Sequence, residues 1–374
     1  MLRILHTSDW QMGLKACHVA AAGTAIRAAR LDAAREVVAI ANRERADVLL
    51  LAGDTFEHNL VEDRLVHEVV KVLSGAQAPV FVLPGNHDAL SHDSVFRRAS
   101  WRNRPANVVI LEDTKPVPIP GTEAVLLPAP VLQKKSFQDP TATLAQAPAG
   151  AIAIGVAHGS LRIEGKHAAD DFPIALDAAH KKGLDYLALG HWHAQYVHDE
   201  RTAYSGTHEP TKFGEGSGQV LIVEIANHGA VPRIQPAPTA RLRWEALEAD
   251  LSAGAEVALQ SIRAAVKALP NPGQTLMRLR TLGESEPDAG LALHALEDEL
   301  AVLLLHVSLE RADVPTSVAR GKLAEVAADN PLVAGLLADL ETASQGEAGG
   351  AQASTADRAA ARQILGELVR RVWP

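Results

Sequence analysis

The sequence predicts an α/β domain followed by a smaller α+β module. Three observations lead to this prediction. Short apolar runs alternate with amphipathic stretches early in the chain, the order of elements changes after a Pro-rich stretch at residues 232–238, and polar motifs follow the apolar runs. With 374 residues, the chain is long enough for one large and one small domain. We expect a first domain at residues 1–236, a second at 237–345, and a linker with a C-terminal helix at 346–374.

Buried strands are predicted where short runs rich in Val, Ile or Leu occur, because such runs suit a strand covered on both faces. In the first domain these runs are Leu2–Ser8, Asp47–Gly53, Pro79–Pro84, Ala151–His158 and Tyr186–Gly190. Further strands with short connections indicate a second sheet of mixed direction; they are Val108–Leu111, Ala124–Leu127 and Gln219–Ala226.

Two helices are predicted between the first strands. The stretch Ala25–Arg45 places Ile26, Val37 and Ile40 on one face of a helix, and Val61–Leu73 has the same kind of pattern. Strands that alternate with helices are typical of a sheet with parallel strands.

The second domain is predicted from a strand–helix–strand–helix–strand order, which gives a small α+β module. Its elements are Leu242–Leu247, Ala255–Ala268, Thr275–Thr281, Leu291–Leu303 and Leu305–Leu309. Beyond it, Gly346–Thr355 has the composition of a linker. The helix Ala356–Trp373 carries an apolar stripe, which we expect to pack on this chain's own second domain or on a second copy in a homodimer.

The composition limits the function classes. The net charge of −9 argues against a protein that holds nucleic acid by bulk electrostatics, since such domains are usually basic. Cys17 is the only cysteine, so no disulfide can form within the chain. There is no apolar run of about 18 residues and no signal-peptide pattern at the N-terminus. We therefore expect a cytoplasmic protein without a membrane partner.

Five polar motifs stand where predicted strands end. Ligands gather at the carboxyl ends of strands in an open α/β sheet, so motifs far apart in sequence can converge there. The motifs are Asp9-Trp10-Gln11, Gly53-Asp54, Gly85-Asn86-His87-Asp88, His158 and Gly190-His191-Trp192-His193.

These residue types suit two divalent cations. Carboxylate and amide oxygens together with imidazole nitrogens are typical ligands of manganese, iron or zinc. Two such ions can activate a water and stabilise the charge of an in-line displacement at phosphorus. The neighbouring His87 is a candidate for protonating the leaving oxygen, with Asp88 orienting its ring.

The order D-x-(H/Q), GD, GNHD, H and GHxH resembles the signature of the calcineurin-like metallophosphoesterases. The resemblance implies a four-layer α/β/β/α sandwich. It also implies one metal held by Asp9, Gln11, Asp54 and His193, and a second held by Asp54, Asn86, His158 and His191.

Two more segments resemble the DNA-repair nucleases of the SbcD type. They are His6–Trp10 and Tyr204–Glu215, and the α+β module resembles the cap domain of those enzymes, so that the resemblance spans roughly residues 1–310. Glu57 stands where archaeal and eukaryotic members often have a histidine, which argues against exonuclease-like handling of a DNA end.

Gln11 in place of the usual histidine resembles the bacterial MPE clade. That resemblance implies a manganese-dependent DNA endonuclease acting on single-stranded or flap DNA in repair. It also implies DNA as the substrate and repair helicases or ligases as partners, while the SbcD type usually has an ATPase partner, which the sequence leaves undecided. A carbonyl oxygen is a harder and weaker ligand than imidazole, which favours manganese over zinc.

Candidate substrate contacts follow from position and charge. The strip that holds Arg97, Arg98 and Trp101 suits phosphate binding and base stacking, although a solvated helix face with a buried Trp101 explains it equally well. His18 and His58 lie near the motifs, and His208 lies in a nuclease-like segment. Two alternatives remain open: a phosphodiesterase or phosphatase for small or cyclic nucleotides, and a catalytically weakened subunit that assembles a repair complex.

Overall fold

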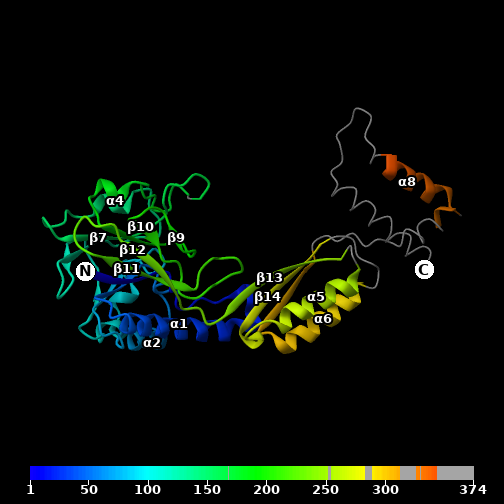
Figure 1. Cartoon of the computed structure of the whole chain (residues 1–374), viewed down its shortest axis with the longest axis horizontal. Coiled ribbons are helices and arrows are strands. Elements are labelled where there is room, and N and C mark those ends of the chain that lie inside the picture. The colour runs from blue at the N-terminus through cyan, green and yellow to red at the C-terminus, as the bar shows by residue number, and fades with distance from the viewer. Residues whose placement is uncertain (167, 252–253, 283–288, 312–325, 329, 343–374) are drawn as a thin grey trace. The chain divides into compact units, whose positions relative to one another are not determined.

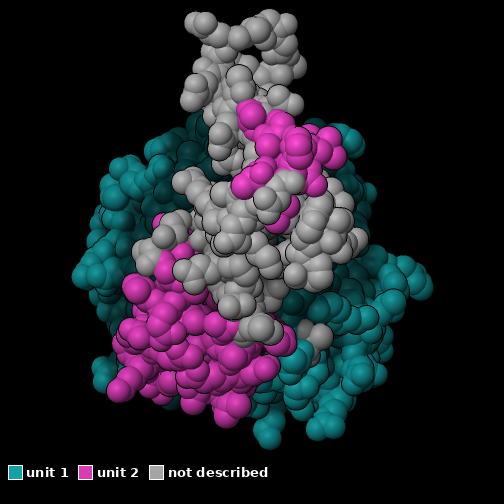
Figure 2. Space-filling model, turned by 90° about the vertical axis from the view of Figure 1, so that its right-hand side faces the viewer, with its two compact units in different colours: residues 1–243 teal, residues 244–374 magenta. Residues whose placement is uncertain are grey.

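A computed structural model describes residues 1–166, 168–251, 254–282, 289–311, 326–328 and 330–342. The chain forms two compact units, Met1–Arg243 and Trp244–Pro374 (Figure 2), and each is described by itself. The predicted linker and C-terminal helix at 346–374 lie outside the described residues.

The first unit contains a six-stranded sheet in the order β12-β11-β1-β2-β3-β4. Strands β1 to β4 are parallel, while β11 and β12 pair antiparallel at one edge. Its strands are β1 (Leu2–Thr7), β2 (Val48–Ala52), β3 (Val80–Leu83), β4 (Val108–Ile110), β11 (Gln219–Ile225) and β12 (Arg233–Pro238).

A second six-stranded sheet has the order β5-β6-β7-β8-β10-β9, with parallel pairing from β6 to β10 and antiparallel edges. The mixed direction was predicted, but the predicted membership is wrong in part. Ala124–Leu127 lies in this sheet as β6, whereas Val108–Leu111 and Gln219–Ala226 belong to the first sheet as β4 and β11. Its strands are β5 (Val117–Pro118), β6 (Ala124–Ala129), β7 (Ile152–His158), β8 (Tyr186–Gly190), β9 (Tyr196–Val197) and β10 (Thr202–Tyr204).

The two sheets pack face to face, and helices cover their outer faces (Figure 1). One apolar core lies between the sheets and includes Ile4 and Leu50 from the first and Ile154 from the second. A second core joins the first sheet to α1 (Gly23–Arg43), α2 (Asp63–Leu73) and α3 (Ala99–Arg102). A third joins the second sheet to α4 (Ala178–Lys181). This layering is consistent with the predicted metallophosphoesterase sandwich.

The Pro-rich stretch is not a linker. Residues 233–238 form β12, which pairs along its whole length with β11, so the predicted boundary at residue 236 falls inside a strand. A proline lacks the N–H that a central strand needs, but an edge strand tolerates it. Because β12 is the edge of its sheet, Pro236 and Pro238 fit there.

The second unit follows the predicted order of elements. A three-stranded sheet, β13-β14-β15, shares an apolar core with two helices, in which Leu259 and Leu296 are buried. The elements are β13 (Arg243–Asp250), α5 (Ala255–Lys267), β14 (Thr275–Leu282), α6 (Ala289–Leu303) and β15 (His306–Arg311). A further helix, α8 (Pro331–Thr342), was not predicted. No helix in the described ranges has the length and apolarity needed to cross a membrane.

Candidate metal centre

The loops after β1 and β2 run side by side at one edge of the first sheet. The backbone N–H of Asp9 donates to Gly53 O at 3.0 Å, and that of Gln11 donates to Asp54 O at 2.9 Å. Asp9, Gln11 and Asp54 all have positive φ, at 54°, 38° and 51°. Such conformations are uncommon outside glycine and are typical of functional sites. These loops therefore bring two of the predicted motifs together.

Glycines precede the site residues because side chains would not fit there. A Cβ on Gly53 would lie 2.1 Å from His158 Nδ1, and one on Gly85 would lie 2.1 Å from Asp54 Oδ1. A Cβ on Gly190 would lie 1.9 Å from the carbonyl oxygen of Ala52. Gly53 and Gly190 thus permit the close approach of the two sheets, and Gly85 permits the close approach of the loops after β2 and β3.

Changing Gly85→Ala should therefore disturb the centre directly. Overpacking of this kind costs about 1–3 kcal/mol, and here the atom that must move is the Asp54 carboxylate. We expect lower thermal stability and weaker manganese binding by calorimetry. Gly273→Ala is the control, because a Cβ there meets nothing within 4 Å. Unchanged manganese affinity in Gly85→Ala would show that the loop geometry does not shape the site.

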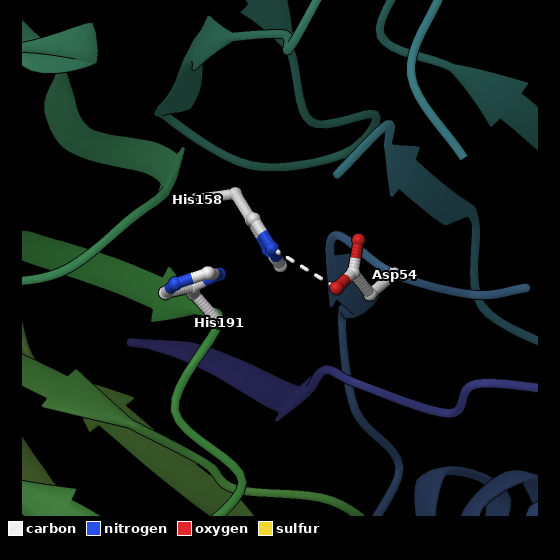
Figure 3. A group of neighbouring side chains, drawn as sticks. All are labelled: Asp54, His158 and His191. Carbon is white, nitrogen blue, oxygen red and sulfur yellow. Dashed lines mark ion pairs between the residues drawn. The ribbon is translucent and has the colours of Figure 1, made fainter. Parts of the chain in front are cut away.

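Asp54, His158 and His191 form a compact group whose ligand atoms lie within 4.8 Å of one another (Figure 3). The distance between His158 Nε2 and Asp54 Oδ2 is 3.3 Å. Asn86 completes the group, because its Oδ1 lies 2.9 Å from His158 Nε2 and 3.0 Å from His191 Nδ1. The structure thus brings together the four residues that the resemblance assigned to one metal.

The donor set fits a cation. His158 Nδ1 lies 2.9 Å from Ala52 O, and because a carbonyl only accepts, Nδ1 must carry a hydrogen. In the neutral ring, the lone pair of Nε2 then faces oxygens of Asp54 and Asn86. Burial lowers the pKa of His158, but the Asp54 carboxylate outweighs it and raises this pKa to about 9. A proton or a cation is therefore needed where these acceptors converge.

Asp9, Gln11 and His193 lie next to this group. The Asp9 carboxylate accepts from the backbone N–H of His191 at 3.1 Å. Burial raises the pKa of Asp9, and the nearby rings of His158 and His193 oppose that rise. Burial also raises the pKa of Asp54, but the nearby His158 and His87 outweigh burial and hold this pKa below its usual value. Two buried carboxylates that share histidine neighbours are a suitable setting for a second cation.

Two carboxylates that were not predicted from the sequence contact His191 and His193, which are predicted metal ligands. Asp171 Oδ1 lies 2.8 Å from His191 Nε2, and Glu215 Oε1 lies 3.1 Å from His193 Nδ1. Such partners fix the tautomer and orientation of a ligand imidazole. Glu215 lies in the nuclease-like segment and could have been found there, whereas no motif marks Asp171.

Glu215→Gln and Asp171→Asn should each weaken metal binding while leaving the predicted ligands in place. Loss of such a partner typically costs about 10–100-fold in metal affinity or activity. Titration of the metal-free protein with manganese would measure the affinity. Ser217→Ala is a suitable control, because it removes a hydrogen bond to the same Glu215 without changing charge at the histidine. Affinities equal to that of the unmodified chain would assign the two carboxylates a purely structural role.

His87 is anchored by its backbone and by one ring nitrogen. Its N–H donates to Asp54 Oδ1 at 2.9 Å, and its Nδ1 donates to the Glu57 carbonyl oxygen at 2.8 Å. The side chain is 31% exposed, so it is accessible to a substrate. Nε2 is therefore the nitrogen that can exchange a proton with a bound molecule.

The predicted role of Asp88 in orienting the His87 ring is wrong. Asp88 is fully buried and accepts from the backbone N–H groups of Phe56 at 3.0 Å and Gly85 at 2.7 Å. Burial raises the pKa of Asp88 to about 7. Its role is to hold two loops together, and the ring of His87 is oriented instead by the main chain of Glu57.

Three of the candidate substrate contacts are used inside the protein. Trp101 is completely buried against Phe56 and Phe96, so it cannot stack on a base. His208 is also fully buried, and its Nε2 donates to Arg30 O. Arg98 donates to the carbonyl oxygens of Val61 and Asn59 and pairs with Asp63.

The remaining candidates, His18, His58 and Arg97, are exposed. Their roles as substrate contacts stay predictions.

Comparison with known proteins gives a family match over the metal centre. The model of the calcineurin-like phosphoesterases matches residues 2–195. The DNA double-strand break repair protein Mre11 of Aeropyrum pernix is 27% identical over 69% of this chain and 66% of its own length. A subunit of the nuclease SbcCD of Bacillus subtilis is 31% identical over 23% of this chain and 22% of its own length. The alignments thus cover less than two thirds of either relative.

Among solved structures, TT1561 of Thermus thermophilus matches with a TM-score of 0.41 and 14% identity, over 64% of this chain and 99% of that one. The family match covers more than half of the chain and contains the residues from Asp9 to His193 that converge in the structure. This chain therefore belongs to the calcineurin-like phosphoesterase family.

Proposed function

We propose that this protein is a manganese-dependent DNA phosphodiesterase that cuts within single-stranded or flap DNA during repair. The observation that carries the proposal is the convergence of carboxylate, amide and imidazole side chains beside a partly exposed histidine ring. Metal-dependent phosphoesterase chemistry is the general activity of the family. The choice of DNA is supported by the two curated relatives, which are named as a break-repair protein and a nuclease.

Each residue has a separate task in the proposed reaction. Two divalent cations, when bound, would activate a water and stabilise the charge of the in-line displacement. Asp54 lies in the group with His158 and His191 and acts electrostatically on Asp9, which supports it as the residue that would contact both ions. His87 Nε2 would donate a proton to the leaving oxygen of the DNA. The hydrogen bond from His87 N to Asp54 holds this acid next to the centre.

Gln11 is proposed to set the metal preference. Its backbone N–H donates to Asp54 O and its side chain is buried, which supports a role as a ligand. Changing Gln11→His should shift activity from manganese towards zinc, because imidazole is a softer ligand than a carbonyl oxygen. Initial rates with each metal, measured beside the melting temperature, would check this. The same metal profile in both proteins would show that Gln11 is not a ligand.

A substrate panel separates DNA from small nucleotides. We expect manganese-dependent cleavage of a single-stranded oligonucleotide and little cleavage of cyclic nucleotides at equal phosphodiester concentration. Saturable cleavage of cyclic nucleotides with DNA left intact would instead support a small-nucleotide phosphodiesterase, which the net charge of −9 would tolerate better. Absence of turnover on any phosphodiester despite bound manganese would support an assembly subunit. A repair helicase, ligase or ATPase partner and a homodimer are further proposals.

A further inference from the structure

A cavity of about 600 Å³ lies directly beside the histidines of the Gly-His-Trp-His motif. This volume falls in the roughly 300–1,000 Å³ range of small-molecule sites. A molecule that is held at the metal centre and extends past these histidines would enter it. The side chains used in the argument below are His191, Trp192, His193, Tyr196, Lys166 and Lys212.

Two lysines from separate segments bring positive charge to this cavity. Lys166 lies in the segment after β7, and Lys212 lies in the segment before β11; both are exposed. The ammonium of Lys166 lies 5.6 Å from the centroid of the Tyr196 ring, a cation–π distance that places it at the wall. Within the described part of the chain, neither lysine forms an ion pair, so both can bind an anion.

The carboxylate beside them is buried and hydrogen-bonded within the protein. Glu215 is the carboxylate among the described residues that line the cavity, and its side chain is 2% exposed. It accepts from the N–H and the hydroxyl of Thr211, both at 2.7 Å, from Ser217 Oγ at 3.0 Å, and interacts with His193. The cavity therefore presents net positive charge, in contrast to the net charge of the chain.

The aromatic wall is held firmly. Trp192 stacks on Tyr204 with ring centroids 4.6 Å apart and an interplanar angle of 11°, and its Nε1 donates to Ser160 Oγ at 3.0 Å. Tyr196 packs against Trp192 at 5.6 Å. Aromatic surfaces next to cationic groups are what single-stranded nucleic acid requires, because the strand presents bases and phosphates in turn.

We propose that this cavity binds the nucleotide next to the scissile phosphate. Lys166 and Lys212 bind the flanking phosphate, and the wall of Trp192 and Tyr196 contacts the sugar and base. The inference rests on the proposed function, since it takes a DNA strand as the ligand. It adds a binding site outside the metal centre and identifies the residues that distinguish a nucleotide from a small phosphodiester.

The test measures the affinity of the whole chain for a labelled oligothymidylate of about 12 nucleotides. Binding is monitored by fluorescence anisotropy in the presence of EDTA. We expect Lys166→Ala and Lys212→Ala each to raise Kd several-fold and to reduce the salt slope by about 0.7. Tyr196→Leu should weaken binding more than Tyr196→Phe, which keeps the ring under Lys166. Lys71→Ala is the charge-matched control. Lys71 is exposed and lies in the last turn of α2, whereas the loop that carries Asp54 leads into the first turn of that helix.

The outcomes separate this inference from the proposed function. Loss of binding in the cavity variants supports the inference even if the unmodified chain cuts no DNA. Equal binding by all variants, or no binding by the unmodified chain, would overturn it even if DNA is cut. Displacement of the oligonucleotide by thymidine monophosphate near the same concentration would also overturn it, because the cavity would then serve free nucleotides and not a strand.

Discussion

Replacing His87 by alanine should lower kcat on DNA by about 10²–10⁴-fold, the usual contribution of a general acid. The imidazole lies at the edge of the centre with Nδ1 bonded to Glu57 O, so only Nε2 can serve the leaving oxygen. The metals should be retained, because the contact of this residue with Asp54 is made by its backbone N–H and survives the change. Single-turnover cleavage and metal content per chain would be measured together.

The leaving group provides an internal control for His87→Ala. A phosphodiester of a nitrophenol departs without protonation, so its hydrolysis should suffer much less than that of DNA. Equal losses on both substrates would indicate damage to the metal centre and not loss of an acid. Full activity on DNA would show that His87 is not the acid. Glu57 should tolerate substitution better than His87, since it orients the ring through its carbonyl oxygen.

Replacing Asp54 by alanine should abolish both metal binding and activity. Its carboxylate accepts from His87 N and faces His158 Nε2, and it is the residue that the family resemblance assigns to both predicted metals. A ligand that binds only the folded state stabilises it by about 2.7 kcal/mol at 100 times Kd. The unmodified chain should therefore melt at a higher temperature when manganese is added, and Asp54→Ala should not.

Asp113→Ala is the matched control for this measurement. Asp113 is an exposed aspartate whose partner is Lys115, so its loss removes a carboxylate without touching the centre. It should keep the manganese-dependent rise in melting temperature. The same rise in Asp54→Ala would contradict the assignment of Asp54 as a bridging ligand.

The strands and the metal motifs could be predicted because both depend on local patterns. Buried parallel strands require continuous apolar runs, and the predicted runs Leu2–Ser8, Asp47–Gly53 and Ala151–His158 each contain an observed strand, β1, β2 and β7. Since parallel strands end at one edge, the polar residues after them had to converge. The short strands β5, β9 and β10 were not predicted. Nor was β12, because an edge strand tolerates the prolines that otherwise indicate a boundary.

Partners that depend on tertiary contacts could not be predicted. Arg30 lies within the amphipathic helix α1, yet it is fully buried and donates to the carbonyl oxygens of Trp10, Asp9 and Glu209. Burial lowers its pKa to about 10. The contact between Asp171 Oδ1 and His191 Nε2 likewise forms only in the folded chain, and no sequence motif predicts it.

The substrate contacts failed for a related reason. A tryptophan among arginines has the same sequence pattern whether it faces solvent or the core, and here Phe56 and Phe96 enclose Trp101. The neighbouring Arg98 is occupied by main-chain carbonyl groups of another loop. Lys166 and Tyr196 show the converse case, since they are 30 positions apart and form a pair only in the folded chain.

The most direct test of the central claim is incubation with closed circular single-stranded DNA, with manganese or with EDTA. The unmodified chain would be compared with Asp54→Ala and His87→Ala. We predict manganese-dependent conversion of circles to linear fragments that is lost in Asp54→Ala and strongly reduced in His87→Ala, because a circle offers no end to an exonuclease. Circles that stay intact while a small phosphodiester is cleaved would contradict the claim that this centre cuts within a DNA strand.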